Sequence, residues 1–195
     1  MLPPFFSLGF HYSKWEEEAS AARTRFYNEQ FEEARIPVDV LWHDLPYSEE
    51  RQYFTFNLNT FKPEQVQKMS LDTSMADRRL VVITDPHIKK ADTFHVYANG
   101  MQIENAPKEE GNGNITSSIF VKTPDRQNVF IGYCWPGDSV WVDFLNAKGQ
   151  EYWSEQYSYN NFIGWNKLFH IWIDMNEPSV FGGPEGTMSK ENYHI

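Results

Sequence analysis

Four short apolar runs recur along the chain, at residues 5–10, 38–42, 80–84 and 168–173. Each is rich in β-branched or aromatic side chains, and none alternates strictly between apolar and polar positions. Such runs are typical of strands that are buried on both faces of a parallel sheet. We therefore predict four parallel strands at these positions.

Segments with helical character lie between these runs. Residues 15–35 are rich in Glu, Ala, Arg and Gln, and their apolar side chains fall roughly on one helical face. Residues 62–79 begin with Pro63 and Glu64, which suit a first helical turn, and residues 151–159 precede the last run. The order of strand and helix repeats, which predicts a parallel α/β fold.

The stretch between the third and fourth predicted strands interrupts this repetition. It contains a Gly/Asn run at residues 111–114 and short β-branched or aromatic pieces at 119–122 and 129–133. Glycine and asparagine mark turns, and short pieces of this kind favour strands over helices. We predict a β-rich or irregular insertion after the third strand, at about residues 90–149.

Composition narrows the function classes. The net charge of -10 disfavours a nucleic acid partner, because phosphate contacts need a basic face. The single cysteine, Cys134, rules out an internal disulfide. No apolar stretch has the length of a membrane span, and the first ten residues lack the positive region of a signal peptide. The aromatic share of 16% suits either a Trp-rich core or a carbohydrate site where rings stack on sugars.

Titratable side chains follow every predicted strand. They are His11, then His43 and Asp44, then Asp85 and His87, and last Asp174 and Glu177. The carboxyl ends of parallel strands share one face, so these groups are expected to converge on one site. A charged residue at a strand end is also an ordinary helix cap, and that interpretation stays open for each of them.

Acidic residues with many aromatic ones, and no Gly-rich phosphate loop, favour glycoside hydrolysis. That reaction uses two carboxyl groups, and it requires neither a metal nor an organic cofactor. A zinc site formed by His11, His43 and His87 is the alternative, but no HExxH or CxxC spacing supports it. We predict that the protein uses no metal and no cofactor.

Residues 172–179, WIDMNEPS, resemble the signature of glycoside hydrolase family 31, the retaining α-glucosidases and their relatives. Residues 8–11 (LGFH), 39–44 (DVLWHD), 82–89 (VITDPHIK) and 134–137 (CWPG) match the same family in the expected order. The resemblance covers essentially the whole chain. It implies that the 195 residues are one partial (β/α)8 TIM barrel containing about the first four strands.

The resemblance implies a role for individual residues. Asp174 matches the nucleophile, and Glu177 is implied to orient or polarise the site. Asp44 is implied to bind hydroxyl groups of the glucose ring. Four side chains are implied to wall the same subsite: Ile88, Trp135, Trp172 and Met175. Barrel core remains the alternative interpretation of Ile88 and Trp172.

The activity implied by the resemblance is release of glucose from α-linked glucosides with retention. Within the family the resemblance is strongest to catalytic α subunits of the glucosidase II type, on residues 2–4, 85–89, 134–137 and 179–188. This group implies trimming of glucosylated N-glycans in the lumen of the endoplasmic reticulum. It also implies a non-catalytic β subunit as a partner.

The second carboxyl group of the family, an acid/base aspartate, lies well downstream of the nucleophile. Residues 178–195 contain no matching motif, so we expect the acid/base beyond this chain and the 195 residues alone to be inactive. Two alternatives stay open. One is a truncated sugar-binding remnant or pseudoenzyme, and the other is an α-xylosidase or transglycosylase of the same family.

Overall fold

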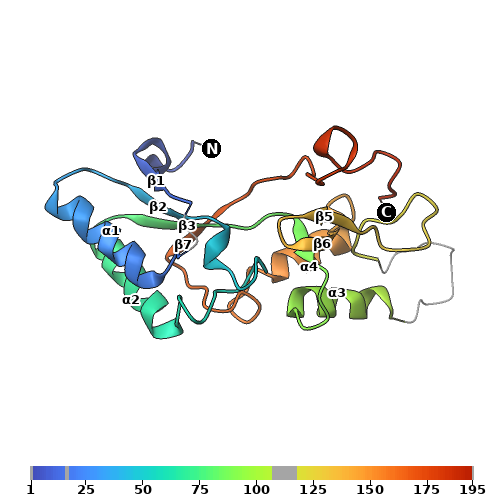
Figure 1. Cartoon of the computed structure of the whole chain (residues 1–195), viewed down its shortest axis with the longest axis horizontal. Coiled ribbons are helices and arrows are strands. Elements are labelled where there is room, and N and C mark those ends of the chain that lie inside the picture. Colours follow the sequence, from blue (N-terminus) through green and yellow to red (C-terminus); the bar gives the residue numbers. More distant parts are fainter. Residues whose placement is uncertain (1, 16–17, 107–117, 195) are drawn as a thin grey trace. The chain divides into compact units, whose positions relative to one another are not determined.

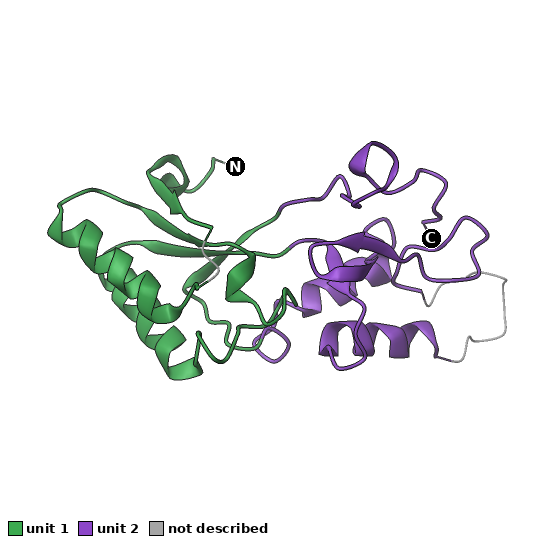
Figure 2. Cartoon of the chain, viewed as in Figure 1, with its two compact units in different colours: residues 1–84, 163–173 green, residues 85–162, 174–195 purple. Residues whose placement is uncertain are grey.

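The structure, a computed structural model, describes residues 2–15, 18–106 and 118–194. The chain forms two compact units (Figure 2). Unit 1 consists of Met1–Thr84 and Ile163–Ile173, and unit 2 consists of Asp85–Phe162 and Asp174–Ile195. Each unit has a sheet of its own.

Unit 1 is built on a four-stranded sheet in the order β1-β2-β3-β7, and every neighbouring pair is parallel (Figure 1). The strands are β1 (His11–Ser13), β2 (Val40–His43), β3 (Arg79–Ile83) and β7 (Phe169–Trp172). The sheet is open, and among the described residues it does not close into a barrel. The predicted fold class, part of a parallel α/β barrel, is confirmed.

Helices α1 (Ala21–Glu33) and α2 (Pro63–Met75) lie on the same side of this sheet (Figure 1). Tyr12 of β1 points to that side, because its ring contacts the rings of Tyr27 and Phe31 on α1. The parallel register places Leu41 and Leu80 on the same face as Tyr12, and both are almost fully buried. The core of unit 1 therefore lies between the sheet and the two helices.

The first predicted strand, residues 5–10, is wrong. The structure has a 3-10 helix at Phe5–Leu8, and β1 begins only at His11. The carbonyl of Pro4 accepts bonds from both the backbone N–H and the hydroxyl of Ser7, which closes a turn. His11 therefore opens the strand instead of following it.

Helix boundaries also differ from the prediction. Residues 15–35 were predicted as one helix, but α1 begins after Ser20, whose hydroxyl accepts the N–H of Arg23 at 3.2 Å. The last helix, α4, spans Ala147–Glu155 instead of residues 151–159, because the side chain of Asn146 caps its first turn. Local capping bonds, not the apolar pattern, decide where these helices start. Residues 16–17 lie outside the described residues.

Unit 2 holds a three-stranded antiparallel sheet in the order β4-β6-β5, together with two helices (Figure 1). The strands are β4 (His87–Lys89), β5 (Gly132–Cys134) and β6 (Gly137–Trp141), and the helices are α3 (His95–Glu104) and α4. The predicted Gly/Asn run at residues 111–114 lies outside the described residues. The insertion boundaries at about 90 and 149 stay a prediction.

Helix α3 occupies a segment for which the sequence indicated strand or irregular structure. It has no side-chain cap at its start and carries Gly100 in its interior, so its intrinsic propensity is weak. A Cβ atom at Gly100 would collide with the ring of Phe120. The helix thus depends on close packing against a segment distant in sequence, which a local pattern does not reveal.

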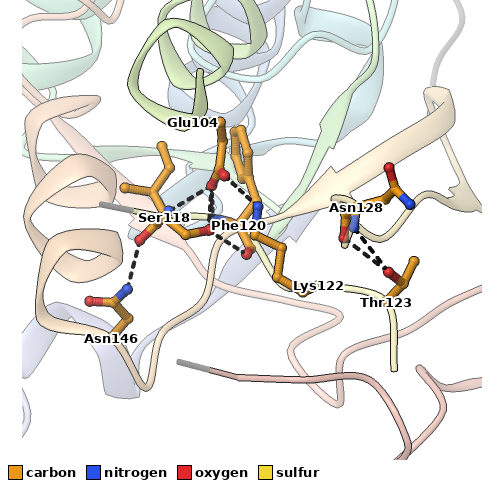
Figure 3. Close-up of polar contacts among 8 residues, drawn as sticks. Glu104, Ser118, Phe120, Lys122, Thr123, Asn128 and Asn146 are labelled. Atoms are coloured by element: carbon orange, nitrogen blue, oxygen red, sulfur yellow. Dashed lines mark hydrogen bonds and ion pairs between the residues drawn. The ribbon is translucent and has the colours of Figure 1, made fainter. Parts of the chain in front are cut away.

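A buried carboxylate joins the end of α3 to the segment 118–122 (Figure 3). Glu104 Oε1 accepts bonds from the hydroxyl of Ser118 and the N–H of Ile119, both at 2.7 Å, and from the N–H of Phe120 at 2.9 Å. Its other oxygen, Oε2, lies 2.5 Å from Lys122 Nζ. The Glu104 side chain is 3% exposed and that of Lys122 is 9% exposed.

A second side chain, Asn146, also holds the segment 118–122. The carbonyl of Ser118 accepts a bond of 2.7 Å from Nδ2 of Asn146, the residue that caps α4 (Figure 3). Further along, the Thr123 hydroxyl bonds the backbone of Asn128 and stabilises a turn. Helices α3 and α4 are therefore connected through one short stretch of backbone.

Glu104→Leu is expected to lower the free energy of unfolding by about 3–5 kcal/mol, because it leaves a buried ammonium and two buried N–H groups without their acceptor. Lys122→Met is expected to cost less, about 1–3 kcal/mol, because Oε2 loses its donor while three neutral donors still bond Oε1. Chemical denaturation of the wild type and both variants measures the two losses in unfolding free energy. Equal losses would show that the ion pair, not the backbone contacts, dominates this cluster.

Candidate functional site

In unit 2, the carboxylate of Asp174 is exposed, and its Oδ1 accepts the N–H of Met175 at 2.9 Å. Met175 itself has φ of 58°, in the left-handed region that side chains other than glycine rarely adopt. Such backbone conformations cluster at active sites, where neighbouring structure holds them. The strained residue beside Asp174 marks this loop as a candidate site.

The side chain of Met175 is held from unit 2 by Trp135. Trp135 Nε1 donates to Met175 Sδ at 3.1 Å, and the Trp135 ring meets the ring of Phe181 edge-on at 5.1 Å. Trp135 lies in the turn between β5 and β6, and 39% of it is exposed. Two of the four predicted subsite walls, Trp135 and Met175, are thus brought into direct contact.

The rest of this loop is anchored in the core of unit 2. Val180 and Met188 pack in one cluster with Cys134 and Trp141. Burial raises the pKa of the Cys134 thiol to about 11, so it packs as a neutral apolar group. The exposed Glu177 lies between the anchored part and Asp174. Both predicted catalytic carboxylates therefore lie on a loop whose later residues are packed in the core of unit 2.

A cavity of about 250 Å³ borders the same loop. Its lining includes Asn176 and Pro178 on either side of Glu177, together with the mostly apolar side chains of Trp141, Phe144 and Leu145. The loop that follows Asp174 is thus not packed on all sides within unit 2.

The third predicted wall, Ile88, is 1% exposed and pairs with Val140 of β6. The neighbouring strand-end groups Asp85 and His87 are fully buried as well, with Oδ2 and Nε2 3.4 Å apart. Burial lowers the pKa of His87 to about 3, so the imidazole is neutral. These residues lie in the interior of unit 2, and their exposed surface is minimal.

Unit 1 carries the other two predicted subsite residues, each just at or after the carboxyl end of a strand. Asp44 follows β2, is half-buried, and its Oδ1 accepts the N–H of Leu45 at 2.7 Å. It also lines a small pocket together with Lys14 and Arg23. Trp172 ends β7, in keeping with the rule that barrel sites form at the carboxyl ends of strands.

The zinc alternative does not fit the sheet. His11 aligns with Val40, and because side chains alternate along a strand, His43 points to the opposite face. His43 packs against the ring of Phe61 on the helical side. Within residues 2–15, 18–106 and 118–194, no group of three or more His, Cys, Asp or Glu could hold a metal ion.

Two features, one in each unit, were not predicted from the sequence. One is the left-handed backbone of Met175, for which the methionine gives no local signal. The other is a hydrogen bond of 2.8 Å from Trp42 Nε1 to His11 Nδ1. His11 and Trp42 both belong to matched motifs, but nothing in their spacing predicts that their side chains meet.

Comparison with known proteins agrees with the family resemblance of the sequence motifs. The sequence model of the TIM-barrel domain of glycosyl hydrolases family 31 matches residues 1–195. Neutral alpha-glucosidase C of Mus musculus is 38% identical over 99% of this chain and 20% of its own length. Glucosidase 2 subunit alpha of Schizosaccharomyces pombe is 36% identical over 100% of this chain and 19% of its own length. The chain spans about a fifth of the relatives it matches.

Solved structures agree. A glucosidase II alpha subunit bound to DNJ superposes with a TM-score of 0.83 at 35% identity, covering 97% of this chain and 18% of that one. A family 31 alpha-glucosidase from Bacteroides thetaiotaomicron superposes with a TM-score of 0.69 at 25% identity, covering 97% and 29%.

Burial of His43 predicts an acid-sensitive step in stability. Burial lowers its pKa from 6.5 to about 4, so the unfolded chain binds the proton more tightly. The stabilisation is complete above pH of about 6.5 and is lost as the pH falls toward about 4. Between pH of about 7 and about 5 we expect a loss of about 2 kcal/mol from this residue.

Urea denaturation across this pH range, for the wild type and for His43→Leu, measures how much of the loss in unfolding free energy comes from His43. The leucine is expected to reduce the pH dependence without leaving an unpaired donor. If the unfolding free energy of the variant falls as much at acid pH as that of the wild type, the loss comes from other groups, such as His87.

Proposed function

This chain belongs to glycosyl hydrolase family 31, and we propose that it carries the nucleophile of a retaining α-glucosidase. The observation that carries the proposal is Asp174: an exposed carboxylate, two residues after the end of a parallel strand, beside a residue with strained backbone. It occupies the position of the nucleophile in the family motif. Because the chain spans about a fifth of its relatives, the activity belongs to the whole protein.

The reaction proceeds in two displacements. One oxygen of Asp174 attacks the anomeric carbon of a glucose ring, and the bond from that carbon to the leaving oxygen breaks. An acid protonates the leaving oxygen. Water then attacks the same carbon, gives its proton to the conjugate base of that acid, and releases glucose with regeneration of the Asp174 carboxylate. We expect the acid/base aspartate beyond residue 195.

Supporting roles follow the family motif. Glu177, three residues after Asp174 and exposed on the same loop, orients or polarises the site. Asp44 accepts hydrogen bonds from glucose hydroxyls, for which a half-buried carboxylate is suited. Trp135 and Met175, already in contact, form one wall of the glucose subsite. The family motif gives Trp172 the same role, whereas the burial of Ile88 favours the core interpretation of that residue. No metal or cofactor takes part.

The substrate is an α-glucoside, and we propose a glucosylated N-glycan within that class. Support comes from relatives named glucosidase 2 subunit alpha and glucosidase II alpha subunit. One such structure is a heterodimeric complex of a catalytic subunit and the binding domain of a regulatory subunit, described as the glucosidase II of the endoplasmic reticulum. We accordingly propose that location and a regulatory partner for this protein. None of the helices in the described residues combines the length and the apolar character that a membrane span needs.

Asp174→Asn is expected to lower turnover of an α-glucoside by at least about a thousandfold, because an amide oxygen is a poor nucleophile. The assay uses the longest natural protein that contains these 195 residues. A slow-reacting fluorinated glucosyl fluoride should lose its anomeric fluoride and add one fluorinated glucosyl unit to the wild type, seen as intact mass, and none to the variant.

Asp77→Asn is the matched control. Asp77 has φ of 57° and its side chain is 97% exposed, so asparagine fits there and activity should not change.

Unchanged turnover in Asp174→Asn would place the nucleophile elsewhere. Faster hydrolysis of α-xylosides than of α-glucosides would replace the proposed substrate class, and glucosyl transfer in place of hydrolysis would indicate a transglycosylase. Sugar binding without turnover would indicate an inactive remnant.

A further inference from the structure

One face of the unit 1 sheet is not covered by α1 or α2. The register aligns His11 with Val40, and Trp42 with Val81, while Trp172 aligns with Ile83 two positions further along β3. Alternation along each strand therefore places His11, Trp42 and Trp172 on this same face. All three side chains are half-buried.

The three aromatic rings form a connected row across the sheet. Trp42 Nε1 donates to His11 Nδ1 at 2.8 Å. The Trp42 ring then meets the Trp172 ring nearly edge-on, with centroids 5.0 Å apart and an interplanar angle of 69°. Edge-on contact at this separation is a favoured aromatic geometry, so the plane of one ring constrains the plane of the other.

The hydrogen bond fixes the tautomer of His11. An indole N–H can only donate, so Nδ1 is the unprotonated acceptor and the neutral ring carries its proton on Nε2. Nε2 is buried and finds no partner among the described residues. A buried donor without a partner is costly, and a leucine would fill a similar space without one.

From this row we infer that His11 and Trp42 are positioning residues that hold Trp172 in the orientation required of a glucose-subsite wall. His11 stops the Trp42 ring from turning over, and the Trp42 ring supports the Trp172 ring. His11 itself touches no substrate. The inference rests on the proposed function, because the role of Trp172 as a wall comes from it.

The pair His11→Leu and His11→Asn tests the acceptor. Leucine fills the space without an acceptor, whereas the asparagine oxygen can reach the position of Nδ1. In the active full-length protein we expect His11→Leu to lower kcat/KM about fivefold, mainly through KM, which is the effect of one ordinary hydrogen bond. His11→Asn should return to within about twofold of the wild type.

A spectroscopic measurement separates positioning from stability. With 5-fluorotryptophan incorporated, the fluorine signals of Trp42 and Trp172 can be assigned from Trp42→Phe and Trp172→Phe. His11→Leu should shift both signals, and His11→Asn should restore both. Phe31→Leu is the control, since Phe31 packs behind β1 against Tyr12. It should lower stability without moving either signal or KM.

The outcomes are distinct. If His11→Leu shifts only the Trp42 signal, or leaves KM unchanged in an active enzyme, the inference is overturned. If His11→Asn fails to restore KM and the signals, the acceptor is not what matters, and the inference is overturned as well. A wild-type protein without α-glucosidase activity would refute the proposed function and the subsite role, and the fluorine spectra would still decide whether His11 sets the position of Trp172.

Discussion

The parallel pairing of β3 with β7 is the constraint on which the other features of unit 1 depend. Ile83 lies opposite Trp172, and the N–H of Thr84 donates to the Trp172 carbonyl at 2.9 Å. A slip of one residue would turn Trp172 toward the helices and break its contact with Trp42. The register of two strands separated by residues 84–168 therefore decides that Trp172 stands on the face of the sheet that α1 and α2 do not cover.

Each unit contains an indole N–H that bonds a side chain of a neighbouring segment. Trp42 donates to His11 in unit 1, and Trp135 donates to Met175 in unit 2. In each case the acceptor belongs to a segment distant in the sequence. Trp42 and Trp135 thus act through their single donor as well as through apolar area, which a count of aromatic residues does not distinguish.

The sequence predicted what depends on regular burial and on motif. The runs around β2, β3 and β7 are apolar because helices and neighbouring strands cover them, and WIDMNEPS identified Asp174 without any coordinates. The prediction from sequence failed where a single local or distant contact overrides the pattern of apolar residues. The bonds of Ser7 to Pro4 turn an apolar run into a 3-10 helix, and the packing of Phe120 against Gly100 favours α3. The left-handed Met175 has no sequence signal, because its cause is tertiary.

The carboxylate of Glu104 has a consequence for how unit 2 unfolds. It accepts bonds from Ser118, Ile119 and Phe120, and the carbonyl of Ser118 accepts a bond from Asn146, the residue that caps α4. Opening this cluster releases the last residue of α3 and the cap of α4 together. The two helices are therefore expected to open as one cooperative unit, with similar hydrogen-exchange protection, although they are separated in the sequence.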